Sequence, residues 1–167
     1  MHAMTEENLK AAFAGESQAH IKYLNFANKA AQDGKANVSR LFQAASFSEQ
    51  IHAGAHLKAL GDVKSSDENL AAAINGEGFE VEEMYAAYMV VAEDQGEKAA
   101  HKSMMRAREA EKVHRDLYTR AKAAVTAGGD VTLDAVYVCP NCGFTMDGER
   151  LDECPLCGWS GADFKQF

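Results

Sequence analysis

Two copies of the pattern Glu-x-x-His constrain this chain more than any other feature. Glu49 and His52 form the first copy, and Glu111 and His114 form the second. In each copy both side chains fall on the stripe that carries the apolar residues, because positions three and four apart share one helix face. A buried carboxylate is costly unless it is paired or bound to a cation. Two such pairs facing inward from two helices predict a metal site inside a helical protein.

Four long helices are expected around this site, paired as two antiparallel hairpins. Apolar residues recur with helical spacing, and the periodic segments end at Gly34, Gly61, Gly96 and Gly128. The breaks at Gly34 and Gly96 are short, so each joins two neighbouring antiparallel helices. The expected helices cover about residues 5–32, 36–60, 77–94 and 97–127.

The first helix of each hairpin also places carboxylates on its apolar stripe. Glu16 lies on the first helix, and Glu77 and Glu80 lie at the start of the third. At ~1.5 Å rise per residue, Glu16 comes level with Glu49 across the first turn, and Glu80 comes level with Glu111 across the second. The two hairpins therefore repeat one plan, which indicates an internal duplication.

A longer connection, residues 62–76, joins the two hairpins. Within it Ser65 and Glu68 form a capping box, which predicts a short helix at about residues 69–74. A connection of this length can cross the bundle. The expected topology is an up-down-down-up four-helix bundle, and the fold class is mainly α.

All four cysteines lie near the C-terminus, in two Cys-Pro-x-Cys-Gly knuckles. They are Cys139, Cys142, Cys154 and Cys157. Four thiolates at this spacing can close tetrahedrally on one metal, and the glycines permit the tight turns beneath the sulfurs. Because the module is too small for its own apolar core, metal binding should supply most of its folding free energy. We expect a helical domain at 1–129 and a metal-bound β domain at 130–167, whose metal the knuckles leave open between iron and zinc.

Charge and hydropathy argue against several classes of partner. The formal net charge is −8, and no cluster of Lys or Arg accompanies it, which argues against nucleic acid and against an anionic membrane surface. No segment approaches the roughly 18 uninterrupted apolar residues of a membrane span, and the N-terminus has no apolar signal-peptide core. A cytoplasmic protein is therefore expected.

The inward residues match a known kind of metal site. Dimetal carboxylate sites in helix bundles use one Glu from each of two helices and Glu-x-x-His from the other two. Carboxylates with one imidazole per metal suit iron or manganese better than a metal that prefers thiolates. The chain departs from the pattern by one acid, because Glu77 and Glu80 are both candidates. Tyr23 and Tyr85 are candidates to hydrogen-bond ligand carboxylates, with plain aromatic packing as the alternative.

Taken together, these motifs resemble the rubrerythrin family over nearly the whole chain. The matching segments are Gly15-Glu16-Ser17-Gln18-Ala19, Glu49-x-x-His52, Gly76-Glu77-x-x-Glu80, Met84-Tyr85, Glu111-x-x-His114 and the two knuckles. The resemblance implies a ferritin-like bundle with a non-haem diiron site, joined to a rubredoxin-like domain with one iron. It also implies that the protein reduces hydrogen peroxide to water in defence against oxidative stress.

The resemblance further assigns roles to the inward residues. Glu49 and Glu111 would bridge the two irons, while Glu16, Glu77 and His114 would be terminal ligands. The iron ligands expected from the resemblance therefore come from all four helices. The short segment between the knuckles, residues 143–153, is also similar to that of rubrerythrins.

The same resemblance implies that one ligand changes during the reaction. On reduction, one iron would exchange the Glu80 carboxylate for His52. The four-cysteine iron would return electrons singly, drawn from an external reductase or rubredoxin. The residues expected to act in catalysis are Glu16, Glu49, His52, Glu77, Glu80, Glu111 and His114.

A head-to-tail homodimer is also expected. At ~1.5 Å per residue, the last helix carries the chain about 24 Å from Glu111 to Ala127. Residues 128–138 could extend to roughly 35 Å and fold back, so chain length alone does not exclude a path within one subunit. Folding back would, however, need a flexible return along the bundle, whereas a two-fold pair brings each thiolate site beside the other subunit's diiron centre. Electrons are therefore expected to pass between subunits.

Two other functions use the same residues. A ferritin-like ferroxidase or iron-storage protein would oxidise Fe(II) at these carboxylates, but the fused four-cysteine domain argues against that as the main role. A zinc-ribbon adaptor would use the helices only as a scaffold, which leaves the buried acids without a purpose. Visible absorption separates these alternatives, because ferric iron bound by four thiolates is red and zinc is colourless.

Overall fold

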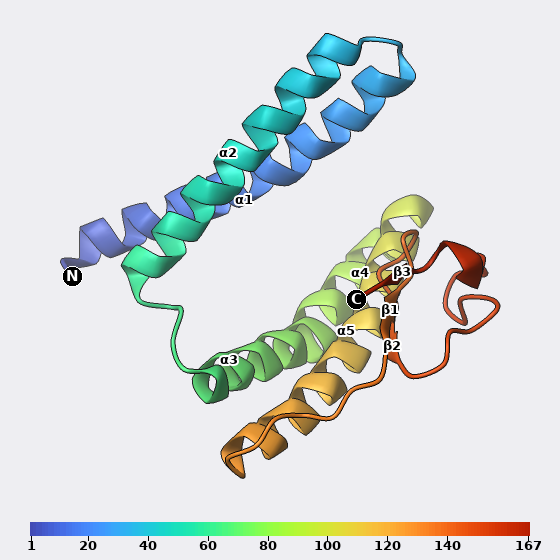
Figure 1. The fold of residues 1–167 in the computed structure, drawn as a ribbon. Helices are drawn as coiled ribbons and strands as arrows, with labels where there is room; N and C mark the ends of the chain where they lie inside the picture. Colours follow the sequence, from blue (N-terminus) through green and yellow to red (C-terminus); the bar gives the residue numbers. More distant parts are fainter. The chain divides into compact units, whose positions relative to one another are not determined.

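The computed structural model describes residues 1–167 and divides into two compact units, residues 1–64 and 65–167 (Figure 1). Each unit is described by itself. None of the helices combines the length and apolar character that a membrane crossing requires.

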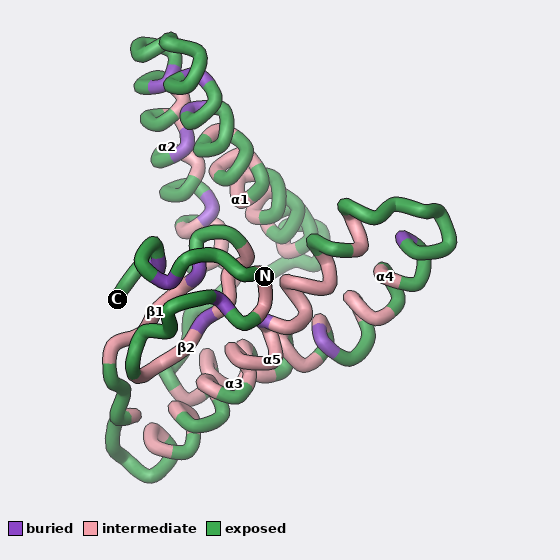
Figure 2. The backbone as a smooth tube through the Cα atoms, turned by 90° about the vertical axis from the view of Figure 1, so that its right-hand side faces the viewer, coloured by how far each residue is buried: buried purple, intermediate pink, exposed green.

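The N-terminal unit is an antiparallel hairpin of two helices, α1 (Ala3–Gln32) and α2 (Ala36–Leu60). Both helices agree with the ranges expected from the sequence. The buried residues of the hairpin are all small, Ala or Ser, and they allow the two backbones to approach closely. Figure 2 shows the buried positions of α2 in purple. At its centre the Ser46 hydroxyl donates to the His20 carbonyl oxygen at 2.8 Å, and His20 Nδ1 lies 2.9 Å from the Ser46 carbonyl oxygen. These hydrogen bonds fix the register of α1 against α2.

The C-terminal unit begins with one long helical run in three parts. These parts are α3 (Ser66–Phe79), a π-helical turn η1 (Glu80–Met84) and α4 (Tyr85–Asp94). The long helix α5 (Lys98–Thr126) follows and contacts α3, η1 and α4. Arg and Lys side chains of α5 hold this run in place; Lys122, for example, pairs with Asp67 at 2.7 Å.

The prediction of a separate short helix before Glu77 was wrong. The capping box at Ser65 and Glu68 forms as expected, but the helix that it opens continues to Phe79 without a break. A glycine inside a helix is destabilising by only about 1 kcal/mol relative to alanine, and no proline interrupts this stretch. Gly76 therefore does not end the helix, and packing against α5 carries the run through it.

The π-helical turn at Glu80–Met84 was not expected from the sequence. Its wider winding lets the Tyr85 N–H donate to the Glu80 carbonyl oxygen, and Arg108 Nε of α5 donates to the Val81 carbonyl oxygen at 2.8 Å. Single π turns inside α-helices occur frequently at functional sites. Here the turn begins at Glu80 itself, three residues after Glu77.

The chain ends in a small antiparallel sheet with strand order β2-β1-β3. Its strands are β1 (Val136–Val138), β2 (Thr145–Asp147) and β3 (Lys165–Gln166), with a 3-10 turn η2 (Gly161–Asp163) before the last strand. Val138 pairs with Thr145 in the sheet. The buried core of the module consists of Cys139, Cys154 and Phe164, so two of its three most buried side chains are expected metal ligands.

The linker after α5 returns along its own helix, the path that chain length alone did not exclude. Strand β2 contacts α5, and Arg120 of α5 pairs with Asp147 of β2 at 2.7 Å. Val131 and Leu133 of the linker line a cavity together with Leu117 of α5; Val131 is half-buried and Leu133 is 44% exposed. The ion pair and the partial burial of Val131 stabilise this return path.

Candidate metal centres

The N-terminal unit brings three of the predicted ligands together. Glu16 of α1 and Glu49 and His52 of α2 present ligand atoms that all lie within 4.8 Å of one another. His52 Nδ1 lies 2.9 Å from Glu49 Oε2. The Glu49 side chain is 20% exposed and that of His52 53% exposed. We call Glu16, Glu49 and His52 the N-terminal triad.

The C-terminal unit contains a matching group, Glu77, Glu111 and His114, which we call the C-terminal triad. Its ligand atoms also lie within 4.8 Å of one another. His114 Nδ1 lies 2.6 Å from Glu111 Oε2 and 3.7 Å from Glu77 Oε1. All three side chains are less than a third exposed. The duplicated Glu-x-x-His pattern thus gives one Glu-Glu-His group in each unit.

Partly buried carboxyl groups crowd together at the C-terminal triad, and this crowding disfavours their ionisation. Burial, the neighbouring Glu111 and the charge of Glu80 raise the pKa of Glu77 to about 7. Burial and the charge of Glu111 also raise the pKa of Glu80, which lies beside the triad. Carboxyls crowded in this way resist ionisation unless a cation compensates them. The donor set, carboxylate oxygens with one imidazole nitrogen, is suited to iron.

The pKa of Glu77 predicts how the stability of the metal-free protein depends on pH. Between about 4.5 and about 7 the folded chain holds a proton on Glu77 that the unfolded chain has lost. The free energy of unfolding should therefore fall as pH rises through this range. We expect Glu77→Gln to remove part of the fall in Tm between about pH 5 and pH 8, while Glu109→Gln, at an exposed pair on α5, leaves it in place. Equal pH profiles for wild type and Glu77→Gln would contradict this assignment.

Two tyrosines lie near the C-terminal triad. Burial, followed by the charges of Glu80, Glu111 and Glu77, raises the pKa of Tyr85. Burial, Glu77 and Glu111 raise the pKa of Tyr118 in the same way, and its ring centroid lies 6.4 Å from that of His114. Tyr118 was not among the residues expected at the site. Its position one turn after His114 on α5 was the available signal, because residues four apart share a helix face.

Tyr23 has a different environment. Its ring packs against Phe26 and Phe42, with ring centroids 6.3 and 6.0 Å away. This is the aromatic packing that was the alternative to a role beside a ligand carboxylate. A hydrogen bond from Tyr23 to such a carboxylate stays a prediction.

The second nitrogen of His114 contacts the β module. Its Nε2 atom lies 2.8 Å from Thr145 Oγ1, while the Thr145 hydroxyl donates to the Gly143 carbonyl oxygen at 3.0 Å. The Thr145 hydroxyl can therefore accept a hydrogen bond from Nε2 while it donates to Gly143. The other ring nitrogen, Nδ1, lies on the side of the carboxylates, where a metal would bind. No sequence pattern indicated a role for Thr145.

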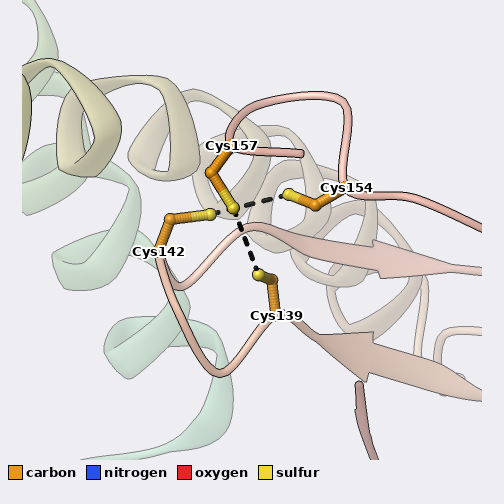
Figure 3. Close-up of side chains that lie close together, drawn as sticks. All are labelled: Cys139, Cys142, Cys154 and Cys157. Carbon is orange, nitrogen blue, oxygen red and sulfur yellow. Dashed lines mark hydrogen bonds between the residues drawn. The ribbon is translucent and has the colours of Figure 1, made fainter. Parts of the chain in front are cut away.

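The four cysteines converge on one point from two loops (Figure 3). The sulfurs of Cys139 and Cys157 are 3.6 Å apart, and so are those of Cys142 and Cys154. A tetrahedral site with metal–sulfur bonds of about 2.3 Å requires sulfurs about 3.8 Å apart, so the cluster has the right size. Burial raises the pKa of Cys157, but hydrogen bonds from Asn141 and the Trp159 N–H outweigh it and bring the value to about 6.

Both knuckles depend on glycine at one position. Gly143 and Gly158 have φ of 79° and 73°, and their N–H groups donate to the carbonyl oxygens of Cys139 and Cys154 at 3.0 and 2.9 Å. Side chains other than glycine rarely adopt this left-handed conformation. The Cys-Pro-x-Cys-Gly spacing therefore folds each loop so that its two sulfurs point to the same side.

The rubrerythrin family model matches residues 7–122. The chain belongs to the rubrerythrin family. It is 38% identical to rubrerythrin-2 of Clostridium acetobutylicum, over 99% of this chain and 98% of that protein. It is 36% identical to nigerythrin of Nitratidesulfovibrio vulgaris, over 92% of this chain and 81% of that protein. The solved structure of fully reduced, all-ferrous nigerythrin matches with a TM-score of 0.58 at 34% identity, covering 98% of this chain and 86% of that one.

Family membership confirms two predictions from the sequence. The fold class is that of the rubrerythrins, mainly α and ferritin-like with a small C-terminal rubredoxin-like domain. The cofactors are a diiron site of carboxylate and histidine residues and an iron at the four-cysteine cluster. The boundary between residues 129 and 130 stays a prediction.

Proposed function

We propose that this rubrerythrin is a non-haem diiron peroxidase that reduces hydrogen peroxide to water in defence against oxidative stress. The observation that carries the proposal lies in the C-terminal unit. There His114 of the Glu-Glu-His triad contacts Thr145, which belongs to the module that holds the four-thiolate cluster. A carboxylate site can take part in two-electron chemistry, and a four-thiolate iron can pass electrons one at a time. Their combination fits a reductase better than a storage protein.

The proposed ligands are those that the family resemblance assigned. Glu49 and Glu111 would be shared between the two irons, and Glu16, Glu77 and His114 would complete the ligand set. His52 and Glu80 would be alternative ligands to one iron, for the reduced and the oxidised centre. The geometry of the two triads supports this set within each unit, and their service to one diiron centre rests on the resemblance.

When bound, two ferrous ions supply the two electrons that cleave the O–O bond, in the balance H₂O₂ + 2 e⁻ + 2 H⁺ → 2 H₂O. The side chains supply protons and orientation. Burial and the charge of Glu111 raise the pKa of Glu80, which favours the protonated carboxyl when no metal is bound and makes this group a candidate proton donor. Tyr85 lies within electrostatic range of the same acids and is a candidate to orient their oxygens through its hydroxyl.

Electrons and partners come from outside the chain. Nigerythrin has been solved in fully reduced, partially reduced and mixed-valence states, and we infer a comparable redox change here. The proposed donor is an external reductase or rubredoxin, which reduces the four-cysteine iron. A head-to-tail homodimer and a cytoplasmic location also stay predictions.

A ferroxidase is the second candidate, because the triads would also bind Fe(II) as a substrate. Stoichiometry separates the two functions. Fully loaded, anaerobically reduced protein should consume one hydrogen peroxide per diiron centre oxidised, and should turn over continuously with an external reductant. The ferroxidase would be favoured if the protein oxidised added Fe(II) faster than it consumed the external reductant with peroxide, and if it retained the ferric iron.

A further inference from the structure

We propose that each diiron centre of this protein is assembled from two chains, which exchange their N-terminal hairpins in a two-fold dimer. The N-terminal triad of one chain completes the C-terminal triad of a second copy. The observation that carries the proposal is the connection between α2 and α3, which is too short for a ferritin-like bundle built from one chain. The proposal rests on the ligand set proposed above and is independent of the peroxide chemistry.

A ferritin-like bundle needs a long connection between its second and third helices. In the up-down-down-up topology α2 and α3 run parallel, so the chain must return along the bundle between them. At ~1.5 Å rise per residue, α2 continues about 16 Å beyond Glu49 to its end at Leu60, and α3 covers about 16 Å from Ser66 to Glu77. Bringing the two acids level within one chain therefore requires a connection that spans about 32 Å along the bundle axis.

The connection in this chain is much shorter. Residues 61–65 join the two helices, and at ~3.6 Å per step they reach at most about 22 Å from one helix end to the other. Gly61 shortens this reach, because its φ of 79° turns the chain back onto α2, where the Asp62 N–H donates to the Leu57 carbonyl oxygen at 3.3 Å. The connection therefore falls at least about 10 Å short of the return that one chain would need.

Contacts at the start of α3 keep its first turn from unwinding to lengthen the connection. The Glu68 N–H donates to the Ser65 hydroxyl at 3.3 Å, as part of the capping box. The Asp67 carboxylate accepts hydrogen bonds from Lys122 Nζ at 2.7 Å and from the Thr126 hydroxyl at 2.6 Å. Because both donors belong to α5, the beginning of α3 is tied to α5 of the same chain.

Each unit supplies half of a dimetal ligand set. Helix-bundle sites of this kind take one Glu from each of two helices and Glu-x-x-His from each of the other two. Each triad provides one Glu and one Glu-x-x-His pair. Since the short connection keeps the two halves of one chain apart, the missing half comes from a second copy. A two-fold exchange is closed and gives two complete centres for each dimer.

The C-terminal unit offers an apolar groove to the hairpin of the second copy. The groove lies between α3 and α5, has a volume of about 480 Å³, and includes Leu70, Tyr118 and Val125 in its lining. Tyr118 and Val125 follow Glu111 by about two and about four helical turns, so they lie on the same face of α5 as this ligand. The groove therefore continues the face on which the C-terminal triad needs its remaining ligands.

The hairpin exposes apolar side chains at the matching level. Leu41 and Val38 lie on the stripe of α2 that carries Glu49, and they are 69% and 45% exposed. In the bundle α2 runs antiparallel to α5, so Leu41, about 12 Å before Glu49, comes level with residues 118–121, about 10–15 Å after Glu111. An exchanged hairpin places these side chains in the groove of the second copy, and their burial stabilises the dimer.

Complementation between two defective chains tests the exchange. Chains with Glu49→Gln and chains with Glu111→Gln are co-expressed with different affinity tags, and mixed dimers are isolated and verified by native mass spectrometry. In an exchanged dimer one centre receives both substitutions and the other receives neither. After anaerobic Fe(II) loading, we therefore expect the mixed dimer to hold about half of the helical iron of wild type, while each variant alone holds little. No recovery in verified mixed dimers would overturn the proposal.

A pair of variants within one hairpin is the matched control. Mixed dimers of Glu16→Gln and Glu49→Gln chains contain a defective hairpin at both centres, whichever chain supplies it. Their helical iron should stay as low as in either variant alone. Recovery in this pair would contradict the proposal, because exchange of hairpins cannot produce an intact centre from these two chains.

Wild-type protein provides a measurement that needs no variant. Native mass spectrometry of iron-loaded protein over a dilution series should show dimers with full helical iron, and monomers that keep only the four-cysteine iron. A monomer with a complete set of helical iron would overturn the proposal. Because these readouts are iron contents, a failure to reduce peroxide would refute the proposed function and leave the exchange to be decided by the iron measurements.

Discussion

Replacing Glu111 with Gln should abolish iron loading at the C-terminal triad and lower peroxide turnover at least about 100-fold, beyond the loss typical for partners of metal ligands. The reason is that the charge of this one carboxylate contributes to the pKa shift of every shifted group around the triad. Its charge raises the pKa of Glu77, Glu80, Tyr85 and Tyr118 after burial has done so, and its Oε2 atom lies 2.6 Å from His114. Glutamine keeps the volume of the side chain but removes its charge and most of its capacity to bind metal.

The measurement combines metal analysis with kinetics. Anaerobic Fe(II) loading followed by desalting should leave Glu111→Gln with less than one iron in its helical part, while the four-cysteine iron and its red colour persist. Glu109→Gln is the matched control, since Glu109 is two residues away on α5 and pairs only with the exposed Lys112. Normal iron content in Glu111→Gln would show that the triad is not a metal site and would remove the basis of the proposed peroxidase.

The parts of the site that lie on regular helices could be read from the sequence. Helix periodicity alone placed Glu49 with His52 and Glu111 with His114, because three residues nearly complete a turn. The glycine turns then set Glu16 level with Glu49 and Glu80 level with Glu111. In the structure Glu77 joins the second group, and Glu80 lies beside it. The structure brings both groups together within 4.8 Å. The cysteine cluster could also be predicted from the sequence, since a glycine at the turn of each knuckle restricts the directions in which the two sulfurs can point.

The parts that the sequence did not show depend on tertiary packing. The π turn at Glu80–Met84 has no sequence signature of its own, and its freed carbonyl is satisfied by Arg108 from a different helix. Thr145 meets His114 only because the linker returns along α5. Contacts between β2 and α5, such as the ion pair of Arg120 with Asp147, accompany that return, and the length of the chain does not predict them.

Replacing Cys154 with Ala should unfold the β module and stop continuous turnover, while leaving a diiron site that reacts with peroxide once. Cys154 is 2% exposed and belongs to a buried cluster with Cys139 and Phe164, so little apolar core remains without the metal. Binding of a structural metal by four such ligands contributes about 10–16 kcal/mol in small metal-dependent domains, more than a module of this size can lose and stay folded. The helices keep their own packing and should persist.

Hydrogen exchange and visible absorption separate this outcome from a general loss of stability. Amides of residues 136–147 should lose protection in Cys154→Ala and the red colour should disappear, while amides of α1, α2 and α5 stay protected. Leu156→Ala is the control within the same knuckle, because it removes a partly buried apolar side chain but keeps all four thiolates. It should retain its colour and turnover. Unfolding of the β module removes the four-cysteine iron. Continuous turnover that survived in Cys154→Ala would therefore mean that electrons reach the triads by a route that bypasses the module.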